Sequence, residues 1–239
     1  SWTPATDNVG VTRYRVLQKK TVLSQADGPT VELTGLTPWT EYTVGIVALD
    51  EAGNTSKLGP EIVFKTTDET PPAFADDATI KASNVTPNSL TLSWPKAADN
   101  VGTNAYQVFK DKVLVATTDG DTPVASIDGL LAGTKYTFDV VASDLAGNQS
   151  EDSPTVTVNT ADTVAPSWGD GAKLVASNVM ANSLTLAWPQ ATDDVAVAHY
   201  EVQQDGLVVA EASGTQAQIE GLKPWTSYNF SVRAKDGVG

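Results

Sequence analysis

Residues 83–94 read SNVTPNSLTLSW, and residues 177–188 repeat almost the same text as SNVMANSLTLAW. Inside the first stretch, apolar residues at positions 90, 92 and 94 alternate with polar residues at 89, 91 and 93. An alternation with a period of two is typical of a β-strand that is buried on one face. The stretch therefore predicts a strand, and its return predicts a fold built from copies.

Aromatic residues recur along the chain with the same long spacing. The recurring sets are Trp2, Trp94 and Trp188; Tyr14, Tyr106 and Tyr200; and Tyr42, Tyr136 and Tyr228. A repeat of this length is too long for a helical solenoid and suits a tandem array of small domains. We expect copies at 1–67, 73–160 and 167–239, the first lacking its N-terminal strands and the last lacking its final strand.

The middle copy contains the full set of strand patterns. Short alternating segments occur at 78–84, 88–94, 104–110, 112–117, 123–128, 136–143 and 153–160. Turn residues separate them, and Asp205-Gly206 in the third copy is typical of a two-residue hairpin turn. Seven short strands without a helical pattern predict an all-β sandwich in each copy.

Composition excludes several classes of function. The 239 residues include 15 Lys and Arg against 29 Asp and Glu, a net charge of −14. Nucleic-acid binding depends on clustered basic residues, so a nucleic-acid partner is not expected. The chain has no long apolar run, and we expect no membrane insertion. With no Cys, a cysteine nucleophile is excluded. The single His, His199, stands where the other copies have Arg13 and Ala105, which indicates a solvated strand end rather than a catalytic base, and we predict no enzyme.

The segment between two predicted strands carries a family resemblance. Residues 36–42 read LTPWTEY and residues 222–228 read LKPWTSY, which resembles the corner motif of fibronectin type III domains. The second copy departs from it at Ala132 and Gly133, where the others have Pro and Trp. The ALDEAGN and TDNVG segments resemble modules of secreted bacterial polysaccharide-degrading and cell-surface proteins.

This resemblance implies three tandem fibronectin type III (immunoglobulin-like) seven-stranded β-sandwiches, the first and last incomplete. It also implies an extracellular, secreted or surface-attached location and a non-catalytic role. Such an array would space or display neighbouring domains of a longer chain, for example in an adhesin or filament. The alternative is an accessory carbohydrate-binding module of a secreted enzyme, with a polysaccharide or cell-surface partner.

Acidic and amide residues are predicted to gather where each domain begins. In the family topology, the loop after the second strand, the loop after the sixth and the incoming linker meet at one end. The candidate ligands are Asp68, Asp99, Asn100, Asp144 and Asn148 in the second copy, and Asp162, Asp193 and Asp194 in the third. Ca²⁺ takes six to eight such oxygen ligands. Alternatively, each Asp or Asn caps its own turn through local hydrogen bonds.

Large side chains are expected at the two domain junctions. Trp39 lies in the corner loop of the first copy, and Phe74 and Trp168 follow the two linkers. The sequence predicts that Trp39 faces Phe74 and that Gly133 faces Trp168. Packing between domains is one interpretation of the exposed aromatic rings, and stacking on sugar rings is the other.

Overall fold

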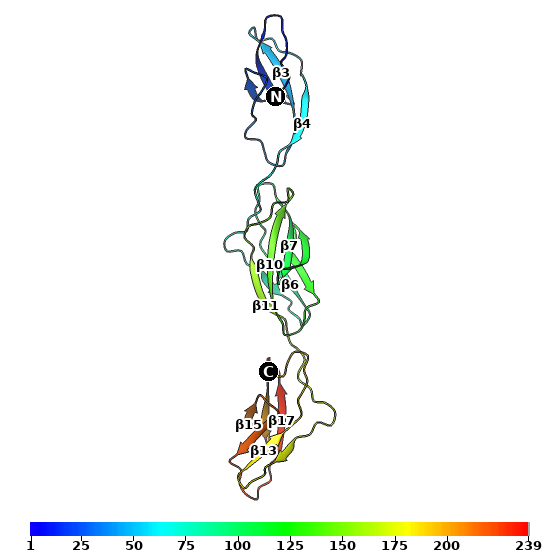
Figure 1. Cartoon of the computed structure of the whole chain (residues 1–239), viewed down its shortest axis with the longest axis vertical. Helices are drawn as coiled ribbons and strands as arrows, with labels where there is room; N and C mark the ends of the chain where they lie inside the picture. Colours follow the sequence, from blue (N-terminus) through cyan, green and yellow to red (C-terminus); the bar gives the residue numbers. More distant parts are fainter. Residues whose placement is uncertain (239) are drawn as a thin grey trace.

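The alternating segments fold as strands throughout the described part of the chain. The structure, a computed structural model, describes residues 1–238 and has seventeen strands and no helix there. Figure 1 shows three β-sheet units in line, connected end to end by short linker segments. We call them copy one, copy two and copy three in chain order. The described residues include no helix that could span a bilayer.

Copy two is a complete sandwich of two antiparallel sheets. One sheet has the order β5 (Lys81–Ser83), β6 (Ser89–Ser93) and β9 (Val124–Asp128). The other has the order β11 (Thr155–Asn159), β10 (Lys135–Asp144), β7 (Thr103–Lys110) and β8 (Val113–Asp119). The seven strands predicted for this copy are all present.

Copy one and copy three show parts of the same arrangement. Copy one has a single sheet, in the order β2 (Thr21–Ala26), β1 (Val11–Gln18), β3 (Glu41–Asp50) and β4 (Glu61–Lys65). Copy three pairs β12 (Val175–Ser177), β13 (Ser183–Ala187) and β16 (Gln216–Glu220) in one sheet. Its second sheet contains β15 (Leu207–Ala212), β14 (His199–Gln204) and β17 (Phe230–Lys235). The predicted end of this domain, Gly239, lies outside the described residues.

Each copy has its own hydrophobic core. In copy two, Trp94 packs edge-on against Tyr106 with ring centroids 5.6 Å apart, inside a cluster closed by both sheets. Trp188 and Tyr200 form the same pair in copy three, also at 5.6 Å. Burying large aromatic rings contributes most of the hydrophobic stabilisation in a domain of this size. The three cores are separate, so each copy can be stable without its neighbours.

The corner motif works as the resemblance implied. The hydroxyl oxygen of Tyr42 accepts a hydrogen bond from the backbone amide of Thr37 at 2.9 Å. Tyr136 accepts one from Leu131, and Tyr228 accepts one from Lys223. Each ring is anchored between the sheets while its hydroxyl holds the crossover loop, which fixes the end of the domain that meets the next copy.

The linkers leave very little chain free between copies. Thr66 belongs to copy one, because its amide donates to the carbonyl of Thr40 and its hydroxyl donates to that of Thr37. Asp68 already belongs to copy two, where its side chain and carbonyl accept hydrogen bonds from two asparagines. Only Thr67 separates these two attachments. At the second junction, Ala161 donates its amide to Thr86 of copy two, one residue before Asp162.

Candidate functional site

Three carboxylates meet at the start of copy two, as the sequence predicted. Asp68 comes from the linker, Asp99 from the loop between β6 and β7, and Asp144 from the end of β10. One oxygen from each lies within 4.8 Å of the other two. Asp68 and Asp144 are nearly buried, with 7% and 3% of their surface exposed. We call these three residues the copy-two cluster.

Backbone hydrogen bonds bring the three segments together. Ala73, just after the linker, forms a two-bond antiparallel bridge with Ala98, which precedes Asp99. This bridge ties the linker to the loop between β6 and β7. The position of the cluster is therefore set by the backbone rather than by the carboxylates, which would repel one another.

The loop aspartates of copy two cap their own turns, as the alternative interpretation expected, and each uses only one oxygen for backbone amides. The asparagines differ from that interpretation, because Asn100 and Asn148 donate across to Asp68. Asp99 Oδ1 accepts hydrogen bonds from the amides of Val101 and Gly102 at 2.9 and 2.7 Å. Asp144 Oδ1 accepts from the amides of Gly147 and Asn148 at 2.7 and 2.8 Å. The second oxygens differ: Asp99 Oδ2 has no hydrogen-bond partner, whereas Asp144 Oδ2 accepts from the Asn148 side chain. Capping is therefore compatible with ion binding at Asp99, and Asp144 Oδ2 would bind an ion beside that hydrogen bond.

The two asparagines connect the linker to the loops. Asn100 Nδ2 donates to Asp68 Oδ1 at 3.1 Å. Asn148 Nδ2 donates both to the backbone carbonyl of Asp68 and to Asp144 Oδ2, at 3.1 and 2.7 Å. Burial acts to raise the pKa of Asp144, but hydrogen bonds from the Asn148 side chain and from nearby backbone amides outweigh it and lower that pKa. Asp144 is thus held as a carboxylate.

Several carboxylate oxygens in these loops have no partner. In the described part of the chain, the buried side-chain oxygens without a hydrogen bond are Asp68 Oδ2, Asp99 Oδ2 and Asp193 Oδ2. The other buried atoms without partners are nitrogens of Trp2, Arg15, Trp94 and Trp188. Leaving a buried charged acceptor unpaired is costly, so these oxygens require an explanation.

Copy three has a related cluster with a different composition. Asp162, Asp193 and Asp194 also place oxygens within 4.8 Å of one another, and we call them the copy-three cluster. Asp193 caps its turn through the amides of Val195 and Ala196, as Asp99 does in copy two. Asp194 is exposed and replaces Asn100, so it cannot donate the hydrogen bond that joins linker and loop.

Three tyrosines that position these loops were not among the residues predicted from the sequence. The Tyr106 hydroxyl accepts a hydrogen bond from the amide of Ala97 at 2.9 Å, two residues before Asp99. Tyr14 and Tyr200 accept the same bond from Ala5 and Ala191. The signal was the constant nine-residue separation between each tyrosine and a loop alanine. These tyrosines are buried in the cores, and their hydroxyl groups also position the acidic loops.

The predicted contacts between Trp39 and Phe74 and between Gly133 and Trp168 were wrong, because the aromatic residues pack within their own copies. The ring of Phe74 packs against Tyr106 of its own copy, and Trp168 packs against Tyr200 in the same way. The bridge from Ala73 to Ala98 turns the residue that follows it into the domain core. Trp39 lies under the ammonium group of Lys65, 3.3 Å from the ring centroid, also within one copy.

Gly133 does lie at a junction, but it faces Val195 rather than Trp168. A Cβ added to Gly133 would come 2.6 Å from Val195 Cγ1 of copy three. Val195 is 40% exposed, whereas the equivalent Val9 of copy one is 79% exposed. The corner of one copy therefore contacts the acidic loop of the next, in the same loop that carries Asp193.

We expect Gly133→Ala to disturb the second junction while both domains stay folded. Gly133 has a φ of 56°, where alanine costs roughly 1 kcal/mol more than glycine, and its methyl group would overlap Val195. Residual dipolar couplings should show a changed angle between copies two and three. The double variant Gly133→Ala/Val195→Ala should restore most of the original angle, and unchanged couplings in the single variant would contradict the contact.

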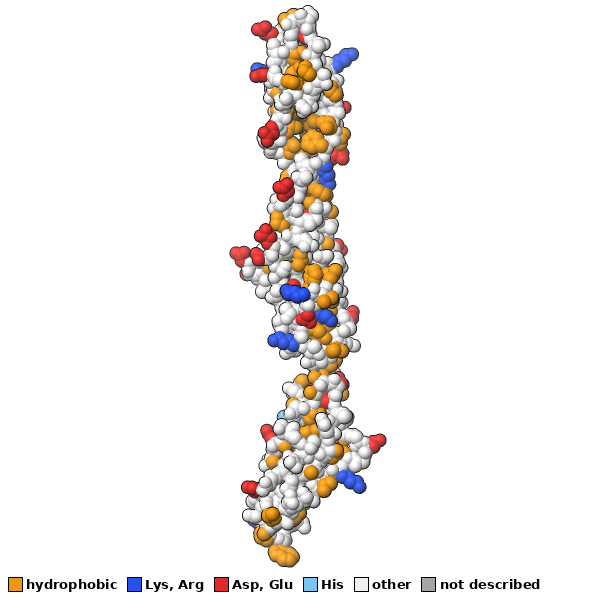
Figure 2. Space-filling model, viewed as in Figure 1, with side chains coloured by type: hydrophobic (Ala, Val, Ile, Leu, Met, Phe, Trp, Pro, Cys, Tyr) orange, Lys and Arg blue, Asp and Glu red, His pale blue; other side chains and the backbone are white. Residues whose placement is uncertain are grey.

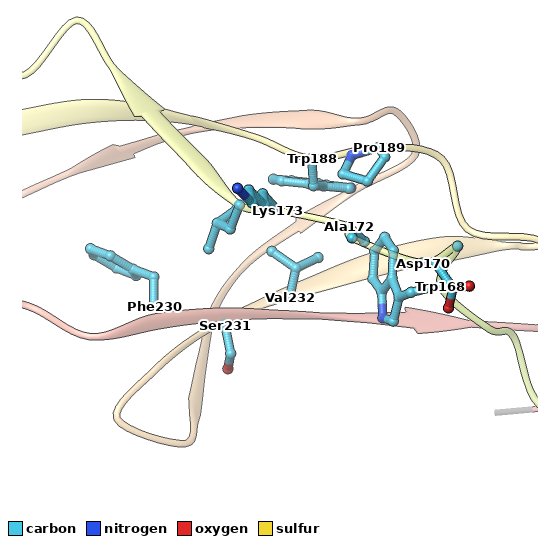
Figure 3. Close-up of a pocket in the computed structure, with 12 residues that line it drawn as sticks. Trp168, Asp170, Ala172, Lys173, Trp188, Pro189, Phe230, Ser231 and Val232 are labelled. Atoms are coloured by element: carbon cyan, nitrogen blue, oxygen red, sulfur yellow. The ribbon is translucent and has the colours of Figure 1, made fainter.

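Copy three has a groove away from the junctions. It has a volume of about 430 Å³ and lies along β17, where copy two has β11 against β10. Figure 3 shows the Trp168, Trp188 and Val232 side chains lining it, with Asp170 and Lys173 from one connecting segment. Its wall is a sheet edge and part of the domain core.

Comparison with known proteins matches the whole array. The family model described as "Fibronectin type III domain" matches residues 1–65, 71–159 and 165–239. Chitinase A1 of Niallia circulans is 40% identical over 177 residues, which cover 72% of this chain and 24% of that protein. Exoglucanase B and endoglucanase B of Cellulomonas fimi are each 34% identical across 100% of this chain and cover 23% and 24% of their own lengths. The chain spans about a quarter of the length of these relatives.

Proposed function

Because this chain belongs to the fibronectin type III family, we propose that it is an extracellular spacer that sets the separation between other domains of a longer, polysaccharide-degrading protein. The fibronectin type III copies themselves are non-catalytic. The relatives are named as chitinases and glucanases, and this chain matches only about a quarter of each. Chemistry on a polysaccharide would thus belong to other parts of the longer protein.

The arrangement of the junctions is the observation that supports this proposal best. Three domains follow one another in a line, and Figure 1 shows no copy folding back against another. At the first junction only Thr67 lies between the last hydrogen bond of copy one and the first of copy two. A flexible tether would need a longer unattached segment, so the geometry favours a spacer of defined reach.

Scattering should show the reach directly. The longest strands have ten residues, and at about 3.3 Å per residue they give domains roughly 30–35 Å long. We expect small-angle X-ray scattering to give a maximum dimension of roughly 100 Å and a cross-section of one domain. A compact particle, with the copies side by side, would contradict the spacer geometry.

The stiffness can be measured separately, because the chain has no cysteine of its own. The double variant Lys20→Cys/Glu151→Cys would carry one spin label in copy one and one in copy two, both at exposed positions. We expect a narrow distribution of distances by double electron–electron resonance. A matched variant with a Gly-Ser insertion after Thr67 should broaden it, and equal widths would argue against a stiff junction.

The function itself is tested in a chimera. A catalytic domain and a polysaccharide-binding domain would be joined either by this chain or by a Gly-Ser linker of equal residue number. We expect equal rates on a soluble oligosaccharide and a different rate on the insoluble polymer, because only the insoluble polymer requires both domains to be engaged at a fixed separation. If the two chimeras have equal rates on the soluble and on the insoluble substrate, the chain does not act as a spacer of defined reach.

One observation favours the second candidate, polysaccharide binding. Trp225 is fully exposed at the corner of copy three, in a groove with Val179, Met180 and Tyr228. Figure 2 shows hydrophobic side chains gathered at that tip of the rod. The same corner meets the next domain in copy two, which favours a domain contact. Affinity electrophoresis in chitin- or cellulose-derived gels separates the two, since Trp225→Ala should remove retardation only if sugar binds there.

A further inference from the structure

We propose that each domain junction binds one Ca²⁺ ion, held by the linker aspartate and the loop aspartates of the following copy. The ligands are Asp68, Asp99 and Asp144 at the first junction, and Asp162, Asp193 and Asp194 at the second. This proposal deepens the spacer function, because the ion would fix the angle between successive domains.

The spacing of the oxygens fits a single ion. Calcium binds oxygen at about 2.3–2.6 Å, so two oxygens on opposite sides of one ion are about 4.6–5.2 Å apart. All pairs of ligand oxygens in each cluster lie within 4.8 Å. One ion can therefore contact all three carboxylates without moving the backbone, and water or amide oxygens can complete the shell.

The unpartnered oxygens point independently to a ligand. Asp68 is more than nine-tenths buried, yet its Oδ2 has no hydrogen-bond donor. Asp99 is only half-buried, but its Oδ2 atom is shielded from solvent and also lacks a donor. Asp193 Oδ2 repeats this in the copy-three cluster. Every such buried oxygen in residues 1–238 belongs to one of these two clusters. A cation would supply the partner that the protein does not.

No basic side chain neutralises the copy-two cluster. The salt bridges of the described chain join Arg13 to Asp27, Lys96 to Asp121 and Lys112 to Asp139. None of them involves Asp68, Asp99 or Asp144. Three carboxylates so close together, two of them buried, repel one another strongly at low local dielectric. A divalent cation removes that repulsion.

Calcium suits these sites better than magnesium. The ligands come from a linker and two loops and include Asp99 and Asp144, which are already committed to turn hydrogen bonds through Oδ1. Ca²⁺ accepts irregular shells of six to eight oxygens, whereas Mg²⁺ requires a near-octahedral shell at about 2.0–2.1 Å and retains its water.

The ion would act on the hinge. Asp68 is the first linker residue attached to copy two, and Thr66 is the last one attached to copy one. Binding Asp68 through a metal as well as through Asn100 confines the motion to Thr67. In copy three the asparagine is replaced by Asp194, so the ion would supply the side-chain link to the linker, beside the backbone bridge between Ser167 and Thr192.

Isothermal titration with Ca²⁺ in a chelator-treated full chain tests the proposal. We expect two ions per chain, falling to one in Asp68→Asn and to one in Asp162→Asn. Asn keeps the shape and a turn-capping oxygen but loses the charge. The matched control is Asp7→Asn, because Asp7 caps the same turn in copy one, through Val9 and Gly10, without forming a third such cluster. This control should still bind two ions.

Thermal unfolding gives a second measurement. A hundredfold excess of Ca²⁺ over its Kd should raise the Tm of copy two by roughly 10–20 °C, and Mg²⁺ should raise it less. Asp99→Asn should abolish this shift, with a folded copy two confirmed by its amide NMR spectrum in chelator. Absence of saturable binding, or the same stoichiometry in wild type, Asp68→Asn and Asp162→Asn, would overturn the site. Small-angle scattering in chelator tests the spacer proposal without calcium. The calcium proposal and the spacer proposal can therefore be contradicted independently of each other.

Discussion

Trp94→Ala is expected to lower the free energy of unfolding of copy two by about 3–5 kcal/mol. The indole packs on Tyr106 in a core cluster where Leu92, Tyr106 and Phe138 are fully buried, so its removal leaves a cavity between the two sheets. The sheets cannot close over it, because their strands are held in register by backbone ladders. Chemical denaturation of the full chain, followed by amide NMR signals of each copy, measures the loss.

The same experiment tests whether the cores are independent. Copy three has its own cluster around Trp188 and Val202, with no part of it supplied by copy two. Its unfolding midpoint should therefore remain unchanged in Trp94→Ala. Trp188→Ala is the matched variant and should affect only copy three. One common transition that shifts for the whole chain would show that the copies unfold as a single unit.

Tyr106→Phe is expected to destabilise copy two by about 1–3 kcal/mol, a large effect for the loss of one oxygen atom. The phenylalanine ring fills the same space, so no cavity forms. The buried amide of Ala97 loses its acceptor, however, and no water can replace it where Tyr106 is fully buried. The loop that carries Asp99 should loosen as well.

Two measurements separate these effects. Equilibrium denaturation gives the stability, and hydrogen exchange at the amides of Ala97, Val101 and Gly102 reports on the loop. We expect faster exchange at all three in Tyr106→Phe. Tyr136→Phe is the control, because it removes a hydroxyl from the opposite corner, where the partner is Leu131. A loss of unfolding free energy below about 0.5 kcal/mol, with unchanged hydrogen exchange in the loop, would show that this hydroxyl neither stabilises copy two nor positions the loop.

Much of the fold could be predicted because its signals are local and repeated. A strand such as Ser89–Ser93 shows its buried face directly in the alternation of its residues. The copies at similar spacing then confirm one another, and the corner motif identifies the topology. The acidic clusters could be predicted for the same reason, since a known topology states which loops share one end of a sandwich.

The contacts at the junctions could not be predicted in this way. The ring of Phe74 packs in the core of its own copy because Ala73 and Ala98 pair through backbone atoms. An isolated backbone bridge leaves no side-chain pattern from which it could be predicted. One ion pair inside copy two could not be predicted either. The buried carboxylate of Asp139 binds the ammonium group of Lys112, which lies in an exposed turn 27 residues earlier. Gly133 and Val195 meet only because two rigid domains adopt one particular angle.

The single unattached residue at the first junction has a consequence for how such arrays grow. The end-to-end distance of a flexible chain rises only with about the square root of its length, so added residues extend it less and less. An array whose successive domains are separated by one free residue adds nearly the full length of a domain with each copy. Duplicating a copy in the gene would then move the attached domains apart by about one domain length. The number of copies therefore determines the distance between those domains.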